Sequence, residues 1–140
     1  MNIFTAKRFH QLVFLLSFIP LGYLIVLIGL WMFFFTLLHA LVYVGIDHAF
    51  DWQEIFHDVF SHVYLISGLT ALLLSVPLAV TSNQWLKTKL GVFWKKLHQL
   101  IYLIAVLAVL HYWLAVKLDI SSPFFYGALL FMLLTLRFLP

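Results

Sequence analysis

Four long apolar blocks occupy most of this chain and decide what it can fold into. They are Phe9–Ile46, His62–Val80, Leu97–Val116 and Phe124–Leu136. A helix needs about 20 apolar residues to cross a bilayer, a length that the second and third blocks meet. With 65% hydrophobic and only 9% charged residues, the chain lies far outside the range of soluble domains. We therefore predict an all-α fold, a polytopic bundle of membrane helices, with residues 1–140 forming a single transmembrane domain.

The first block, Phe9–Ile46, is too long for one crossing. Proline removes a backbone donor and glycine tolerates unusual dihedrals, so we expect a kink or tight turn at Pro20–Gly22, followed by a full span. The basic pair Lys7-Arg8 ahead of an apolar run is also typical of a signal peptide. Because no polar region with a small-residue cleavage site follows, an uncleaved membrane anchor is the better interpretation.

The segments between the blocks differ in charge. Residues 82–96 carry four lysines and no acid, whereas residues 47–61 carry four acids and no lysine or arginine. By the positive-inside rule, the Lys87–Lys96 loop is cytoplasmic and the Asp47–Asp58 loop faces outward. The net charge of +3 is therefore a sign of orientation and not of nucleic-acid binding.

Two connecting segments have helical patterns of their own. In residues 51–60 the apolar positions repeat as one helical face, and Asp51 is a suitable N-cap with Glu54 three residues later. This pattern predicts a short amphipathic helix on the outer membrane surface. The segment Ser82–Gly91 predicts a matching inner helix, capped by Ser82 and stopped at Gly91.

Two histidines, His39 and His111, lie within apolar blocks. His39 precedes Asp47 by eight residues and His111 precedes Lys117 by six, so both lie roughly 9–12 Å inside the outer ends of their helices. Equal depth on separate helices is what a bis-histidine haem requires. Two other roles stay open at this point, a hydrogen bond that joins the bundle or a proton relay.

A third histidine, His98, lies near the inner end of the same block as His111. The thirteen-residue spacing gives a rise of roughly 20 Å and an angle of about 140° between the side chains. The helix therefore carries a π-bulge or the two imidazoles address different neighbours. The outer histidines, His48, His57 and His62, have no spacing that gathers three metal ligands, and we interpret them as solvated.

Several chemistries have no sequence support. The glycines are scattered, no Ser–His–Asp pattern is present, and the chain has no cysteine. Any chemistry must therefore be carried by a cofactor.

The segment "PLAVTSNQWLKTKLGVFWKKLHQLIYLIAVLAVLHYWLAVKLD", Pro77–Asp119, resembles the most recognisable part of the MsrQ (YedZ) family. "GLWMFFFTLLHALVY", Gly29–Tyr43, is similar to the family's other histidine helix, and "KRFHQLVFLLSFIPL" to its first helix. The shared features are Thr81-Ser82, Leu90-Gly91, Trp94, Leu97-His98, Tyr102, His111-Tyr112, Trp113 and Lys117.

The resemblance implies a ferric-reductase-like transmembrane domain in the bacterial inner membrane, with the Asp47–Asp58 loop in the periplasm. It implies b-type haem held by His39 and His111, with His98 as the third functional histidine and the site of a second haem if there is one. It also implies that the protein binds FMN. Family members carry a further helix and a basic loop with paired arginines before the His39 helix. Ile25-Val26 stand here in the place of the arginines, and the domain is shortened by about one helix.

The function implied by this resemblance is electron transfer, by an electron-transfer subunit of an oxidoreductase system and not by its catalytic subunit. Electrons would come from the quinone pool or a flavin reductase and pass to a periplasmic, molybdopterin-dependent methionine sulfoxide reductase subunit. Two alternatives are a proton or ion conductor and a structural subunit that has lost haem. A conductor would show pH-dependent flux without a chromophore, and a structural subunit would tolerate loss of His39 and His111.

Overall fold

The computed structural model describes residues 3–116 and 121–139, with side chains from residue 22 onward except that of residue 138. The described residues form helices joined by short connections, and none of them lies in a strand. The elements are α1 (Ile3–Val42), the π-helical turn η1 (Tyr43–Asp47), α2 (Trp52–Ser61), α3 (Val63–Val80), α4 (Gln84–Leu90), α5 (Val92–His98), α6 (Leu100–Ala115) and α7 (Ser121–Phe138). The predicted all-α class is confirmed.

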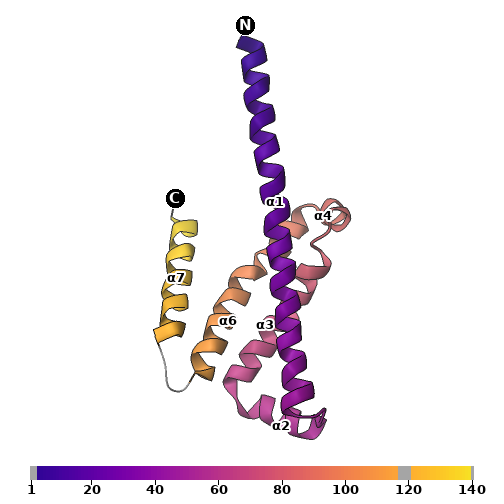
Figure 1. Ribbon diagram of the computed structural model, residues 1–140, viewed down its shortest axis with the longest axis vertical. Coiled ribbons are helices and arrows are strands. Elements are labelled where there is room, and N and C mark those ends of the chain that lie inside the picture. Colours follow the sequence, from indigo (N-terminus) through magenta and orange to yellow (C-terminus); the bar gives the residue numbers. More distant parts are fainter. Residues whose placement is uncertain (1–2, 117–120, 140) are drawn as a thin grey trace.

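The prediction of a break at Pro20–Gly22 is wrong, because α1 runs through these residues as one helix of 40 residues. An internal proline removes one backbone hydrogen bond, a loss that membrane helices tolerate, so the sequence signal was too weak to end the helix. The part from Gly22 onward lies along the bundle and continues into η1 as a candidate span, Gly22–Asp47 (Figure 1).

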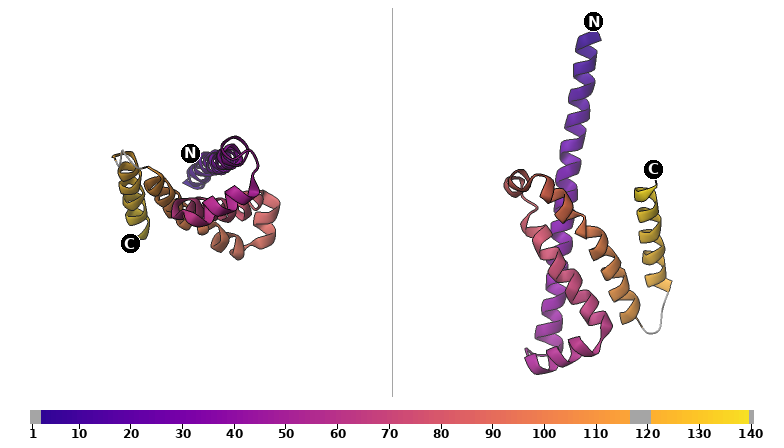
Figure 2. Two further views of the ribbon diagram at one scale, coloured as in Figure 1. Left: turned by 90° about the horizontal axis from the view of Figure 1, so that it is seen from below. Right: turned by 180° about the vertical axis from the view of Figure 1, so that it is seen from behind.

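Helices α3 and α6 form the centre of the bundle. Their core contains Ala71, Leu78 and Ile104, which are buried against one another. Serines and glycine on the α3 face allow close approach of α6, as small residues do between membrane helices. Helix α1 packs on α3, and α7 packs on α6 at the outer edge of the bundle (Figure 2).

The bundle presents an apolar surface. Its accessible area is 11334 Å², whereas a folded soluble protein of this mass exposes about 7,500 Å². Residues of α1 account for much of the difference, since no position in the apolar window of its span is buried. With the further spans Val63–Val80 and Val92–Ala115 and the shorter apolar helix Ser121–Arg137, these observations confirm a multi-pass membrane protein.

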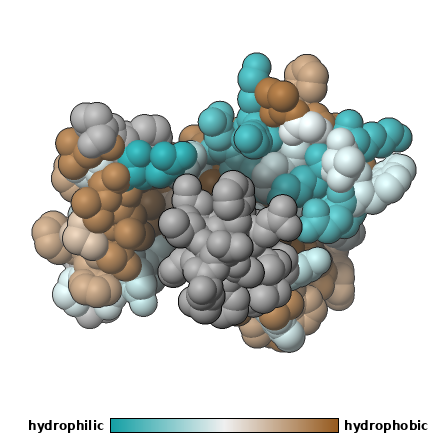
Figure 3. All heavy atoms as spheres, turned by 90° about the horizontal axis from the view of Figure 1, so that it is seen from above, coloured by the Kyte–Doolittle hydropathy of each residue, from teal (hydrophilic) through white to brown (hydrophobic). Residues whose placement is uncertain are grey.

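The polar segments lie at opposite ends of the bundle. Helix α2 closes one end, and its predicted cap is confirmed because the Asp51 carboxylate accepts hydrogen bonds from the Gln53 and Glu54 amides. Helices α4 and α5 lie at the other end, where hydrophilic side chains gather (Figure 3). The cap of α4 is Asn83 and not Ser82 as predicted, because the Asn83 side chain accepts from the Leu86 amide.

Candidate functional site

The structure brings His39 and His111 together. His39 comes from α1 and His111 from α6, and their ring centres lie 6.2 Å apart at an interplanar angle of 76°. Both helices pack on α3, which sets their separation. The two rings therefore lie next to each other, as the equal depth predicted from the sequence requires.

The His111 ring is held by α3. It is half-buried, and its Nδ1 lies 2.7 Å from the carbonyl oxygen of Tyr64. A carbonyl oxygen only accepts hydrogen bonds, so Nδ1 carries a proton, and in the neutral imidazole it is Nε2 that has the lone pair. A backbone carbonyl on Nδ1 is the usual partner of a metal-binding histidine, because it fixes the tautomer and the orientation of the ring.

The spacing of the two rings fits a haem. A metal–imidazole nitrogen bond is about 2.0 Å long and the ring centre lies about 1.1 Å beyond the nitrogen, so two imidazoles that held one iron from opposite sides would have centres about 6.2 Å apart. The 6.2 Å between His39 and His111 agrees with this value. Among the described residues, no group of three or more histidine or acidic side chains is arranged to hold a metal ion.

His98 does not join this pair. It ends α5, and Gln99, with φ −67° and ψ −18°, separates α5 from α6 without a π-helical turn. Of the two alternatives that the spacing left open, the structure therefore supports the one in which the two histidines have different neighbours. Its ring stacks on Trp94 at 3.9 Å, and its Nδ1 lies 3.1 Å from the Trp94 carbonyl oxygen. Trp94 in turn donates from Nε1 to the carbonyl oxygen of Thr81 at 2.8 Å, which joins α5 to the end of α3.

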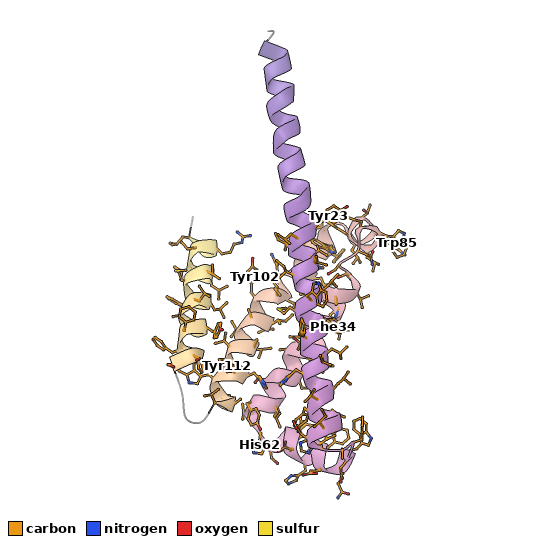
Figure 4. All side chains as sticks on the ribbon, viewed as in Figure 1. Tyr23, Phe34, His62, Trp85, Tyr102 and Tyr112 are labelled. Atoms are coloured by element: carbon orange, nitrogen blue, oxygen red, sulfur yellow. The ribbon has the colours of Figure 1, made fainter. Side chains whose placement is uncertain are left out.

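A cavity of about 300 Å³ lies beside His98. Two cationic side chains, Lys95 and Arg137, contribute to its lining, and Arg137 donates from Nε to the Tyr102 hydroxyl at 3.2 Å. Figure 4 marks Tyr102 on α6, toward the end of the bundle opposite His62. The full lining is Trp94, Lys95, His98, Gln99, Tyr102 and Arg137. The cavity therefore combines positive charge with aromatic faces.

The sequence missed a polar cluster at the other end of the bundle. Asp58 of α2 accepts a hydrogen bond from the Tyr43 hydroxyl at 2.8 Å. Its carboxylate also lies 2.9 Å from Nδ1 of His62 and 3.6 Å from Nε2 of His48. The bond from Tyr43, together with the two imidazoles, lowers the pKa of Asp58. The i, i+4 spacing of Asp58 and His62 was the one local signal for this cluster.

The interpretation of the outer histidines as solvated is correct for His57 but wrong for His48, whose side chain is only 12% exposed. The η1 turn places His48 against Tyr43, with ring centres 4.5 Å apart. His48 Nδ1 is buried without a hydrogen-bond partner among the described residues, since the Glu54 carboxylate lies 3.6 Å away. The contacts of His48 with Tyr43 and Asp58 therefore make it part of this polar cluster and not a solvated side chain.

The fold and the paired imidazoles define a class of protein, a multi-pass helical membrane protein with two facing histidines on separate helices. Residues 4–109 match the family model described as ferric reductase like transmembrane component. The chain belongs to this family. No solved structure matches it significantly.

The chain is also similar to curated proteins named protein-methionine-sulfoxide reductase heme-binding subunit MsrQ. The protein of Rhodospirillum rubrum is 46% identical over 115 residues, covering 81% of this chain and 55% of its own length. That of Caulobacter vibrioides is 41% identical over 111 residues, covering 79% and 53%, and that of Xanthomonas campestris pv. campestris is 42% identical over 111 residues, covering 79% and 51%. The chain thus spans about half the length of the curated relatives it matches.

Proposed function

We propose that this protein is a haem b electron-transfer subunit of a methionine sulfoxide reductase system, with His39 and His111 as the axial ligands of one haem. The observation that carries the proposal is the 6.2 Å separation of the two imidazole centres. The names of the similar proteins, which are heme-binding subunits, support it independently.

The protein's own residues would hold the iron, set its ligand field and keep it from water. The Tyr64 carbonyl holds the proton on His111 Nδ1, and Nε2 would be the atom that holds the iron. The apolar residues of α1 and α6 would cover the faces of the macrocycle. When bound, haem supplies one-electron transfer at iron, a chemistry that no side chain here provides.

We propose that His98 serves the electron-transfer path at the end of the bundle that carries α4 and α5. It lines the cavity near Lys95 and Arg137, whose charges suit the propionates of a second haem or the phosphate of FMN. The Trp94 and Tyr102 faces suit a flat aromatic group. Through this cavity we propose that electrons enter from the quinone pool or a flavin reductase.

We further propose that electrons leave at the α2 end, toward a periplasmic, molybdopterin-dependent catalytic subunit. His39 and His111 lie nearer that end by their position along α1 and α6. The exposed lysines of α4 and α5 support a cytoplasmic location for the opposite end in the bacterial inner membrane.

The test is an absorption spectrum of the detergent-purified protein, oxidised and dithionite-reduced. We expect a six-coordinate b-type spectrum that is lost in His39→Ala and in His111→Ala. His57→Ala is the matched control, because His57 is exposed on α2 and should leave the spectrum unchanged. Comparison of the haem-to-protein ratio with that of His98→Ala tests the second haem. A colourless wild type after expression with ample haem would overturn the proposal in favour of a conducting or structural subunit.

A further inference from the structure

Gly68 of α3 lies directly against the ring of His111. A Cβ atom added at position 68 would lie 2.6 Å from Nδ1, 2.8 Å from Cε1 and 3.2 Å from Cγ of His111. Distances below 3.0 Å are essentially never seen for real Cβ atoms, so either the ring or the helix would have to move. The glycine is therefore a steric requirement of this ring position.

The histidine has little freedom to give way. Cγ is the ring atom attached to the histidine's own Cβ, so relieving that contact requires a change at χ1 or a shift of α6. A shift of α6 is opposed by its packing on α3, where Ile104 is buried with Ala71 and Leu78. Rotation of the ring would move Nδ1 away from the Tyr64 carbonyl oxygen, which now lies at 2.7 Å.

We propose that Gly68 is a positioning residue for His111, the residue that would hold the haem iron, because the absence of a side chain at position 68 lets the imidazole reach the Tyr64 carbonyl and fixes the orientation of the ring. Gly68 and Tyr64 are four residues apart on α3, so one helical face supplies both the space and the acceptor. The role in ligation rests on the proposed function, whereas the steric relation between Gly68 and His111 does not.

The variant that tests this proposal is Gly68→Ala. Loss of an outer partner of a metal ligand lowers metal affinity by roughly 10- to 100-fold, and we expect a loss of haem affinity of that order. We also expect the haem midpoint potential to rise, since an imidazole without its Nδ1–H···O bond is a weaker donor and stabilises ferric iron less. The low-spin spectrum should become a mixture with a five-coordinate form.

Gly29→Ala is the matched control. Gly29 also lies within a membrane helix, but a Cβ atom there meets nothing within 4 Å. Both variants receive the same increase in helix propensity, so a difference between them reports the contact with His111. Unchanged haem affinity and potential in Gly68→Ala would overturn the proposal.

Two measurements on the ligand-free protein separate this proposal from the proposed function. In ¹⁵N NMR of labelled histidine, the wild-type His111 should be the Nδ1–H tautomer, and Gly68→Ala should lose this state. In a double-mutant cycle, Gly68→Ala should lower the stability of the wild-type protein. It should not lower the stability of the His111→Ala variant, because the ring that it would meet is absent there. A colourless wild type would refute the haem proposal, while additivity in the cycle would refute the steric role of Gly68.

Discussion

Replacing Tyr43 with phenylalanine should loosen α2 from the end of the bundle. The Tyr43 hydroxyl donates to the Asp58 carboxylate at 2.8 Å and so joins η1 to α2 across the turn between them. The turn itself is tight, with positive φ values at Ala49 and Phe50. Phenylalanine keeps the ring and its contact with His48 but removes the donor, so the variant isolates this one hydrogen bond.

The magnitude follows from the charge and exposure of the acceptor. A hydrogen bond to a charged group contributes about 1.5–3 kcal/mol, and every 1.4 kcal/mol corresponds to about tenfold in an equilibrium constant. The Asp58 side chain is 26% exposed and keeps His62 at 2.9 Å, so it is not left without a partner. We therefore expect the lower limit, about tenfold more frequent opening of α2.

Hydrogen exchange of the amides in α2, followed by mass spectrometry in nanodiscs, measures this opening directly. Exchange over residues 55–61 should be about tenfold faster in Tyr43→Phe, while exchange in the centre of α3 should not change. Tyr126→Phe is the control, because Tyr126 is an exposed tyrosine on α7 far along the chain from this cluster. Equal protection of α2 in wild type and Tyr43→Phe would refute the reasoning that this hydrogen bond holds α2.

Three further predictions concern the two ends of the bundle. Because Asp58 has a lowered pKa when folded, the stability it contributes is present above its unfolded pKa of about 3.9 and is lost as the pH falls through the folded value. The protection factors of the α2 amides, which correct for the intrinsic pH dependence of exchange, should therefore fall below about pH 4 in wild type and not in Asp58→Asn. Gly91→Ala should destabilise the α4–α5 corner by about 1–3 kcal/mol in a denaturant titration, because Gly91 has φ +52° and ψ −117°. Since the chain has no cysteine, Lys89→Cys and Glu54→Cys provide single thiols, and a membrane-impermeant maleimide added to intact spheroplasts should label only Glu54→Cys.

The sequence predicted the features that depend on local pattern or on depth in the membrane. The Asp51 cap follows from residue type and spacing, and the pairing of His39 with His111 follows from their equal distance to the outer ends. The interruption between α5 and α6 at Gln99 was missed because no proline or glycine marks it. The Asp58 cluster was missed because the η1 turn, and not sequence spacing, brings Tyr43 to α2.

The two proposed ligands are held unequally, which leads to a last prediction. His111 is half-buried and has the Tyr64 carbonyl on Nδ1, whereas His39 is exposed, with no hydrogen bond to its ring from any described residue. A fixed tautomer and orientation reduce the entropy lost on ligation, so His111 should be the stronger ligand. His39→Ala should then retain part of its haem in a five-coordinate form, and His111→Ala should lose more. Equal haem content in the two variants, measured as pyridine haemochrome per protein, would show that the hydrogen bond to Tyr64 does not contribute to haem affinity.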